Sequence, residues 1–316
     1  MNNQNTNSTV AIPEALNKPQ KVNVWKEMKK NKISYAMVAP FMILFTIFPI
    51  VPVLASCILS FTYFNMLEWP EWRGWYNYQR LFLDDEIFLI AIRVTLKFAV
   101  ITGPLSYLIC FFFAWFINEL PPKIRAFMTM VFYAPSLCGS VYTIWTFIFS
   151  GDSYGVLNSY LLQWGILDGP IQWLTDENYN VTIIIIIQLW LSLGTSFLAF
   201  IAGFQTQDRS LFEAGAIDGI RNRFQELFYI TVPSMKPQLM FGAVIQIAGA
   251  FGVGAVPRAL GGFPSTNYSL QTIETHIFDY GSVRYEMGYA SAIAFLLAIV
   301  MILTRNLISK LLQEKD

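Results

Sequence analysis

The chain has 316 residues, of which 55% are hydrophobic and 13% are charged. A soluble domain usually has about 45–50% apolar residues, glycine included, and about 25% charged residues. The 21 Lys and Arg residues balance 21 Asp and Glu residues, which excludes the basic stripe that nucleic-acid binding requires. With a mean hydropathy of +0.46, the composition indicates a polytopic membrane protein rather than two soluble domains.

The cysteine, histidine and acidic residues argue against metal chemistry. Cys57, Cys110 and Cys138 lie in apolar runs, without the paired spacing of a zinc site or a disulfide framework. We expect them to be small core residues. His276 is the only histidine, so no multi-histidine metal site can form, and the acidic run 84–86 is expected to be a solvated outer loop.

The first 34 residues are polar and then basic. A cleaved signal peptide would place its apolar stretch within roughly the first 15–30 residues, so none is expected here. We predict a cytoplasmic tail over 1–34 that ends in an interfacial helix around 22–30, with a solvated linker as the alternative. The lysines of this segment are Lys18, Lys21, Lys26, Lys29, Lys30 and Lys32.

Six apolar runs follow, each close to the about 20 residues that a helix needs to cross the hydrocarbon core. Pro40, Pro49 and Pro52 in the first run predict a kinked or tilted helix. Before the second run, residues 86–95 could form a short surface helix that leads into the span. The six runs cover residues 35–62, 94–118, 126–149, 181–204, 238–257 and 287–308.

The distribution of Lys and Arg predicts the orientation. Of the 21 such residues, 15 lie in the N-terminal tail, the turn between the second and third runs, the loop 205–237 and the C-terminus, whereas 151–180 has none. Because cytoplasmic loops carry the excess of Lys and Arg, both termini and the loop 205–237 are predicted to be cytoplasmic. The predicted fold is all-α, with a six-span transmembrane domain over 35–312 and a cytoplasmic C-terminus at 313–316.

The loop 205–237 is the longest cytoplasmic connection between predicted spans. Its segment 213–237 reads EAGAIDGIRNRFQELFYITVPSMKP and predicts two short helices joined at Gly219. Gly219 can adopt the positive φ of a helix C-terminal turn, and Pro233 removes a backbone donor where the loop leads into the fifth span.

The residues before Gly219 suit a docking element. Ala214, Gly215 and Ala216 are small enough to let the first helix lie close against a partner surface. Glu213 and Asp218 offer carboxylates that an arginine of the partner could bind in a bidentate manner.

This segment resembles the cytoplasmic EAA loop of ABC importer permeases. The residues that match the family pattern are Glu213, Ala214, Ala216, Asp218, Gly219, Phe224, Ile230 and Pro233. Gly215 departs from the pattern at the third motif residue but is still small. Weaker similarities favour the carbohydrate branch, similar to the permeases of the maltose and glycerol-phosphate importers. They lie at 33–59, 125–145, 155–158 and 288–294.

The resemblance implies a permease subunit of an ATP-driven, binding-protein-dependent carbohydrate importer in a bacterial or archaeal cytoplasmic membrane. Its implied partners are a second homologous permease, two cytoplasmic ATPase subunits, an extracytoplasmic solute-binding protein and membrane lipid. The chain has no G-x-x-x-x-G-K-[ST] phosphate-binding loop, so ATP–Mg is expected on the ATPase partners, and the chain is not expected to be an enzyme. The implied ATPase-coupling residues are Glu213, Ala214, Gly215, Asp218 and Gly219.

Aromatic, amide and hydroxyl side chains in the spans are candidates for the substrate path, because sugars stack on aromatic faces and bond to polar groups. Interfacial aromatics and inter-helix hydrogen bonds are the alternative for each. The candidates are Tyr142, Trp145, Gln188, Trp190, Gln246 and Asn267.

Three other functions stay open at this point. One is a permease of the same type for a phosphorylated polyol or a peptide, another is a stand-alone secondary transporter or channel, and the third is a membrane scaffold. Predicted spans three to five contain no charged residue, which argues against an ion-coupled transporter. The identity of the sugar, and which permease subunit holds it, are left open by the sequence.

Overall fold

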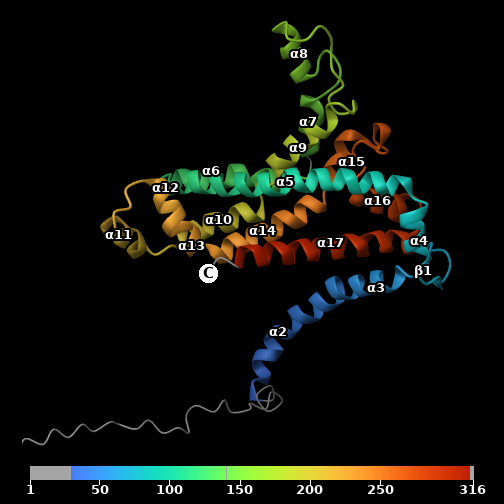
Figure 1. The fold of residues 1–316 in the computed structure, drawn as a ribbon, viewed down its shortest axis with the longest axis horizontal. Helices are drawn as coiled ribbons and strands as arrows, with labels where there is room; N and C mark the ends of the chain where they lie inside the picture. Colours follow the sequence, from blue (N-terminus) through green and yellow to red (C-terminus); the bar gives the residue numbers. More distant parts are fainter. Residues whose placement is uncertain (1–29, 140, 314–316) are drawn as a thin grey trace, which may run out of the picture. The chain divides into compact units, whose positions relative to one another are not determined.

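The computed structural model describes residues 30–139 and 141–313, whose regular secondary structure is helical apart from one short hairpin (Figure 1). The predicted N-terminal tail falls almost wholly outside these residues. The chain divides into two compact units, residues 1–54 and 55–316, and each is described by itself.

In the first unit, α2 (Lys32–Phe45) continues through a π-helical turn, η2 (Thr46–Ile50), into the start of α3 (Val51–Leu59). The wide turn contains Pro49, which lacks the N–H that a regular α-helical bond requires. The helix runs through Pro40 without a break. The irregularity expected from the prolines is therefore a local widening at Pro49.

The described residues contain between four and six candidate membrane spans. Two helix pairs qualify only as bent spans: α6 (Pro122–Leu137) with α7 (Val141–Ile148), and α14 (Lys236–Phe251) with α15 (Ala255–Gly261). Each candidate overlaps one of the six predicted apolar runs. The four helical stretches that qualify alone are Lys32–Leu59, Glu86–Asn118, Asn180–Gln205 and Met287–Lys310.

The structure bends two predicted spans sharply, and it also interrupts the fourth predicted span at residues 192–194. The third run bends by 87° after Leu137, and the fifth bends by 41° after Phe251. Pro135 lies in the last turn before the first break, and Gly252 and Gly254 lie within the second. Proline and glycine both weaken a helix, so each helix ends although the apolar run continues.

The second span is one uninterrupted helix, α5 (Glu86–Asn118), so residues 86–95 are part of the span and not a separate surface helix. Asp85 caps its N-terminus by accepting a hydrogen bond from the Phe88 backbone N–H at 2.9 Å. The fourth span consists of α9 (Asn180–Leu191) and α10 (Thr195–Gln205), and the last is α17 (Met287–Gln313).

The core of the second unit forms where α5 packs against α10 and α14 (Figure 1). Phe197 and Phe200 of α10 are fully buried there, whereas Phe98 of α5 is buried in another cluster with residues of α9. A Cβ atom at Gly242 would lie 2.3 Å from Cζ of Phe200, so α14 can cross α10 at this distance only with glycine.

The connection between α7 and α9 contains α8 (Val156–Gln163) and is organised by one buried side chain, Asn158. Its amide nitrogen lies 3.0–3.2 Å from the carbonyl oxygens of Ser150, Asp152 and Ile171. Its Oδ1 accepts from the Trp173 indole at 2.8 Å and from the Ile171 N–H at 3.2 Å. The side-chain amide of Asn158 therefore links both ends of the connection between α7 and α9 through hydrogen bonds.

A two-stranded antiparallel hairpin follows α3. Strand β1 (Thr62–Tyr63) pairs with β2 (Glu71–Trp72), with Thr62 opposite Trp72. Helix α4 (Tyr76–Leu83) holds the base of the hairpin, because Asn77 donates to the carbonyl oxygens of Ser60 and Thr62 at 2.9 Å each.

Candidate functional site

The segment singled out by the sequence folds as two short helices with a reversal between them (Figure 1). Helix α11 (Arg209–Ile217) is followed by α12 (Arg223–Glu226), and Gly219 between them has a φ of 94°. The N–H groups of Gly219 and Ile220 donate to the carbonyls of Ala216 and Gly215, at 3.4 and 2.9 Å. This is a Schellman turn, which ends α11 with its last carbonyls satisfied.

Gly215 is the buried residue of α11. A Cβ atom there would lie 2.6 Å from Cδ1 of Ile230 and 3.1 Å from Cδ1 of Ile220. The departure from alanine at the third motif position therefore accommodates these two isoleucine side chains, which cover the inner face of α11.

The outer face of α11 carries side chains without partners among the described residues. Glu213 and Asp218 are exposed, and their carboxylates make no hydrogen bond or ion pair there. Ile217 is 87% exposed, and Phe228 and Tyr229 after α12 are also largely exposed. Apolar side chains beside unpaired carboxylates are typical of a surface that a partner covers.

The second half of the loop is fixed to the end of α5. Phe224 packs edge-to-face against Trp115 with ring centroids 5.5 Å apart. Arg223 lies 2.9 Å from Glu226 and 3.2 Å from Glu119, and the hydrogen bond to Glu226, followed by the charge of Glu119, raises the pKa of Arg223. Helix α12 is therefore in direct contact with the C-terminal end of α5.

A cavity of about 340 Å³ lies where the two broken spans meet. It is lined by residues from the end of α6, the start of α7, α9 and the link between α14 and α15, and Tyr142 and Gln188 are among them. Oε1 of Gln188 is buried and has no hydrogen-bond partner among the described residues. An unpaired buried acceptor costs about 1–3 kcal/mol, so a hydroxyl donor reaching it would be bound favourably.

Two of the six candidate path residues, Tyr142 and Gln188, therefore line this cavity. Two other candidates, Trp145 of α7 and Trp190 of α9, do not line it, but they pack edge-to-face on each other at 5.2 Å. The indole N–H of Trp145 is buried without a partner in the described chain.

The other two candidates lie elsewhere. Gln246 is buried between helices, where it accepts from Ser106 at 2.9 Å and donates to Cys110 Sγ and the Ser192 carbonyl at 3.2 and 3.3 Å. This is the inter-helix hydrogen bonding that the sequence left as an alternative. Asn267 is exposed in a loop, where it donates to Glu177 at 3.0 Å.

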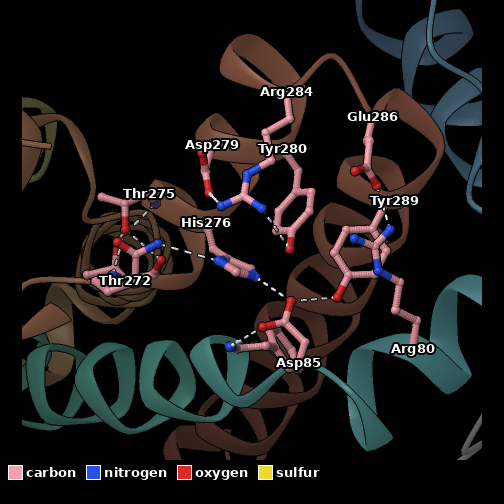
Figure 2. Close-up of polar contacts among 12 residues, drawn as sticks. Arg80, Asp85, Thr272, Thr275, His276, Asp279, Tyr280, Arg284, Glu286 and Tyr289 are labelled. Carbon is pink, nitrogen blue, oxygen red and sulfur yellow. Dashed lines mark hydrogen bonds and ion pairs between the residues drawn. The ribbon is translucent and has the colours of Figure 1, made fainter. Parts of the chain in front are cut away.

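A buried polar cluster joins the start of α5 to the segment before α17 (Figure 2). Asp85, with a side chain 7% exposed, accepts from Nε2 of His276 at 2.9 Å and from the Tyr289 hydroxyl at 2.7 Å. Arg80 of α4 pairs with Glu286 and lies 4.4 Å from the Tyr289 ring centroid. The expectation that the whole acidic run is solvated is therefore wrong for Asp85.

The cluster rests on α16 (Ile273–Phe278) and the π-turn η5 (Asp279–Val283). Tyr280 packs edge-to-face on Tyr289 at 4.5 Å and on His276 at 5.0 Å. Arg284 pairs with Asp279 at 2.7 Å and lies over the Tyr280 ring. Among the described residues, no three His, Cys, Asp or Glu side chains are placed to hold a metal ion.

Replacement of Asp85 by asparagine is expected to destabilise the protein by about 1–3 kcal/mol at pH 7, because a buried acceptor is lost. Burial opposes ionisation, but hydrogen bonds from His276, Tyr289 and the Phe88 N–H outweigh it and lower the pKa of Asp85 to about 2. A lowered pKa means that the ionised form stabilises the fold above about pH 4, and that this contribution is lost as the pH falls toward 2.

Thermal unfolding in detergent between pH 3 and 7 measures the effect. The wild type should lose stability more steeply than Asp85→Asn below about pH 4. The adjacent Asp84 is exposed and has no side-chain partner in the described chain, so Asp84→Asn is the matched control. Equal unfolding temperatures for the two variants would contradict the prediction.

Comparison with known proteins identifies the family. Residues 24–315 match the binding-protein-dependent transport system inner membrane component family. The probable ABC transporter permease protein YesP of Bacillus subtilis is 31% identical over 280 residues, covering 86% of this chain and 88% of YesP. The arabinooligosaccharides transport system permease protein AraP of the same organism is 28% identical over 289 residues, covering 90% of each chain.

The fold agrees with this assignment. A chain in the crystal structure of a bacterial ABC transporter involved in the import of the acidic polysaccharide alginate superposes with a TM-score of 0.73. The two are 25% identical, and the match covers 93% of this chain and 99% of the other. The chain therefore belongs to the family of binding-protein-dependent transport system inner membrane components, as its resemblance to ABC importer permeases indicated.

Proposed function

We propose that the chain is a permease subunit of an ATP-driven, binding-protein-dependent importer of a sugar or oligosaccharide. The carbohydrate class is supported by AraP, which is named for arabinooligosaccharides, and by the alginate importer, whose chain has the same fold. The cavity between the broken spans is consistent with it, since Gln188 and Tyr142 line it and can bond to sugar hydroxyls.

The observation that carries the ATP-driven part is the outer face of α11. The coupling site in this proposal consists of Glu213, Ala214, Gly215, Asp218 and Gly219. A cytoplasmic ATPase covers its exposed residues, while the buried Gly215 lets α11 lie against the two isoleucines behind it. Exposed Ile217 would supply apolar contact, and the unpaired carboxylates would bind basic residues of the ATPase. ATP–Mg binds to the ATPase, and this chain binds no cofactor.

Six spans and cytoplasmic termini complete the proposal. If each bent helix pair counts as one span, residues 35–312 form six spans, and an even number places both ends of the chain on one side. The loop 205–237 then lies on that side too. A second, homologous permease would form the other half of the path.

The broken spans suggest how transport proceeds. A helix that is already interrupted at mid-membrane can change its angle at the break without losing intrahelical hydrogen bonds. We infer that movement of the coupling loop, transmitted through Phe224 and Arg223 to α5, opens and closes the cavity between α6–α7 and α14–α15.

Co-purification and uptake together test the proposal. The tagged chain, expressed with the genes that neighbour its own, should purify with an ATPase, a second permease and a solute-binding protein. In proteoliposomes the complex should take up a labelled saccharide only with internal ATP. Transport by the chain alone, without ATP, would show a secondary transporter instead, and competition by peptides or polyol phosphates but not by saccharides would reassign the substrate.

A further inference from the structure

The tip of the β1–β2 hairpin, residues 64–70, exposes apolar side chains that the proposed transport function does not use. Leu67 and Trp69 are 90% and 91% exposed, and Met66 is also exposed. These values exceed those of most apolar residues on the described spans. Side chains of this kind need a partner, because water-exposed apolar area is unfavourable.

The tip is held in a fixed shape. Oδ1 of Asn65 accepts from the backbone N–H groups of Leu67 and Glu68 at 3.1 and 3.0 Å, which closes a turn inside the tip. At the base, Phe61 stacks on Trp72 and meets Trp75 edge-to-face, with ring centroids 5.7 and 5.1 Å apart. Exposure of the apolar side chains is therefore built into the hairpin.

The position of the hairpin relative to the ends of α3 and α17 indicates what covers the tip. Strand β1 begins three residues after the last residue of α3, and the start of α17 contacts it directly. The Gly288 N–H donates to the Phe64 carbonyl at 3.2 Å, and a Cβ on Gly288 would lie 2.1 Å from the Thr62 carbonyl oxygen. The hairpin thus lies beside the C-terminal end of α3 and the N-terminal end of α17 (Figure 1). Both helices belong to candidate membrane spans, so their ends are expected near the edge of the hydrocarbon layer.

We propose that residues 64–70 insert into the membrane–water interface and anchor this end of the bundle to the lipid surface. Tryptophan prefers the headgroup level, where its ring is apolar and its N–H is solvated, and leucine reaches the acyl chains below it. The exposed Arg73–Glu71 ion pair follows the tip and stays in water in this placement. This placement is independent of which solute is transported.

Photolabelling from the lipid tests the proposal. The full chain, purified with its accompanying subunits, is placed in nanodiscs whose phosphatidylglycerol carries a diazirine near the glycerol end of one acyl chain. Mass spectrometry after illumination should find adducts on residues 64–70. Tyr154 is the matched control, because it is 90% exposed in the loop before α8 and should carry no adduct.

A double variant of the tip, a control variant and addition of the solute-binding protein distinguish lipid contact from protein docking. Leu67→Asn with Trp69→Asn should abolish the tip adducts while labelling of the spans persists, and Tyr154→Asn should change nothing. Absence of tip adducts in the wild type, with the spans labelled, would overturn the proposal. So would disappearance of the tip adducts on addition of the solute-binding protein, which would make the tip a protein-docking surface.

Discussion

Gly219→Pro is expected to abolish ATP-driven uptake while leaving the chain inserted in the membrane. Gly219 has a φ of 94°, whereas proline fixes φ near about −65°. Proline would also remove the N–H that donates to the Ala216 carbonyl. A clash of this kind costs about 3 kcal/mol or more. If this whole free-energy cost falls on the docked state, the affinity of the chain for the ATPase falls about 100-fold.

Uptake of labelled saccharide and retention of the ATPase on the tagged chain are the two measurements. Gly219→Asn is the control, because asparagine tolerates the left-handed conformation, and it should keep most of the uptake. Glu213→Lys should lose uptake without distorting the turn, since its side chain has no partner in the described chain. Full uptake by both Gly219→Pro and Glu213→Lys would mean that the loop is only a connection.

Asn158→Leu is expected to unfold the connection between α7 and α9. The substitution leaves three backbone carbonyls, the Ile171 N–H and the Trp173 indole N–H without their partner. Each unsatisfied buried group costs about 1–3 kcal/mol, and some will find water, so a net loss of about 3–5 kcal/mol is expected. The change should lower the unfolding temperature and expose residues 150–173 to protease.

Asn178→Ala is the matched control for this prediction. Asn178 is exposed in the same connection and bonds only to Asp176, so its removal should cost less than about 0.5 kcal/mol. Limited proteolysis of the two variants in detergent compares them directly. Unchanged cleavage of Asn158→Leu would show that the connection is held by contacts other than the amide.

Hydropathy located the membrane helices because burial in lipid requires long apolar runs, whatever the tertiary structure. It missed the two breaks because the runs 126–149 and 238–257 stay apolar across them. Pro135 and Gly254 were visible signals, but single prolines and glycines are tolerated within membrane helices. Pro40, inside a helix that continues through it, shows why the same signal could not be applied everywhere.

The turn at Gly219 in the loop 205–237 could be predicted because it depends on residues close to it in sequence. Gly219 lies just after a helical pattern, and its positive φ follows from the sequence around it. Asp85 could not be predicted, since its partners His276 and Tyr289 lie 191 and 204 residues away in sequence. The same holds for Asn158, whose partners extend to Trp173 across an irregular connection.

The break in the third span leaves a natural thiol at a useful place. Cys138 caps α6, is exposed and lines the cavity between the broken spans, whereas Cys110 is buried. A membrane-impermeant maleimide can therefore reach Cys138 only from the side to which the cavity is open. Maleimide labelling of Cys138 from each face of a vesicle would therefore report on the opening and closing proposed for this cavity as nucleotide is added or removed. Cys57, which is only partly buried, would first be replaced by serine.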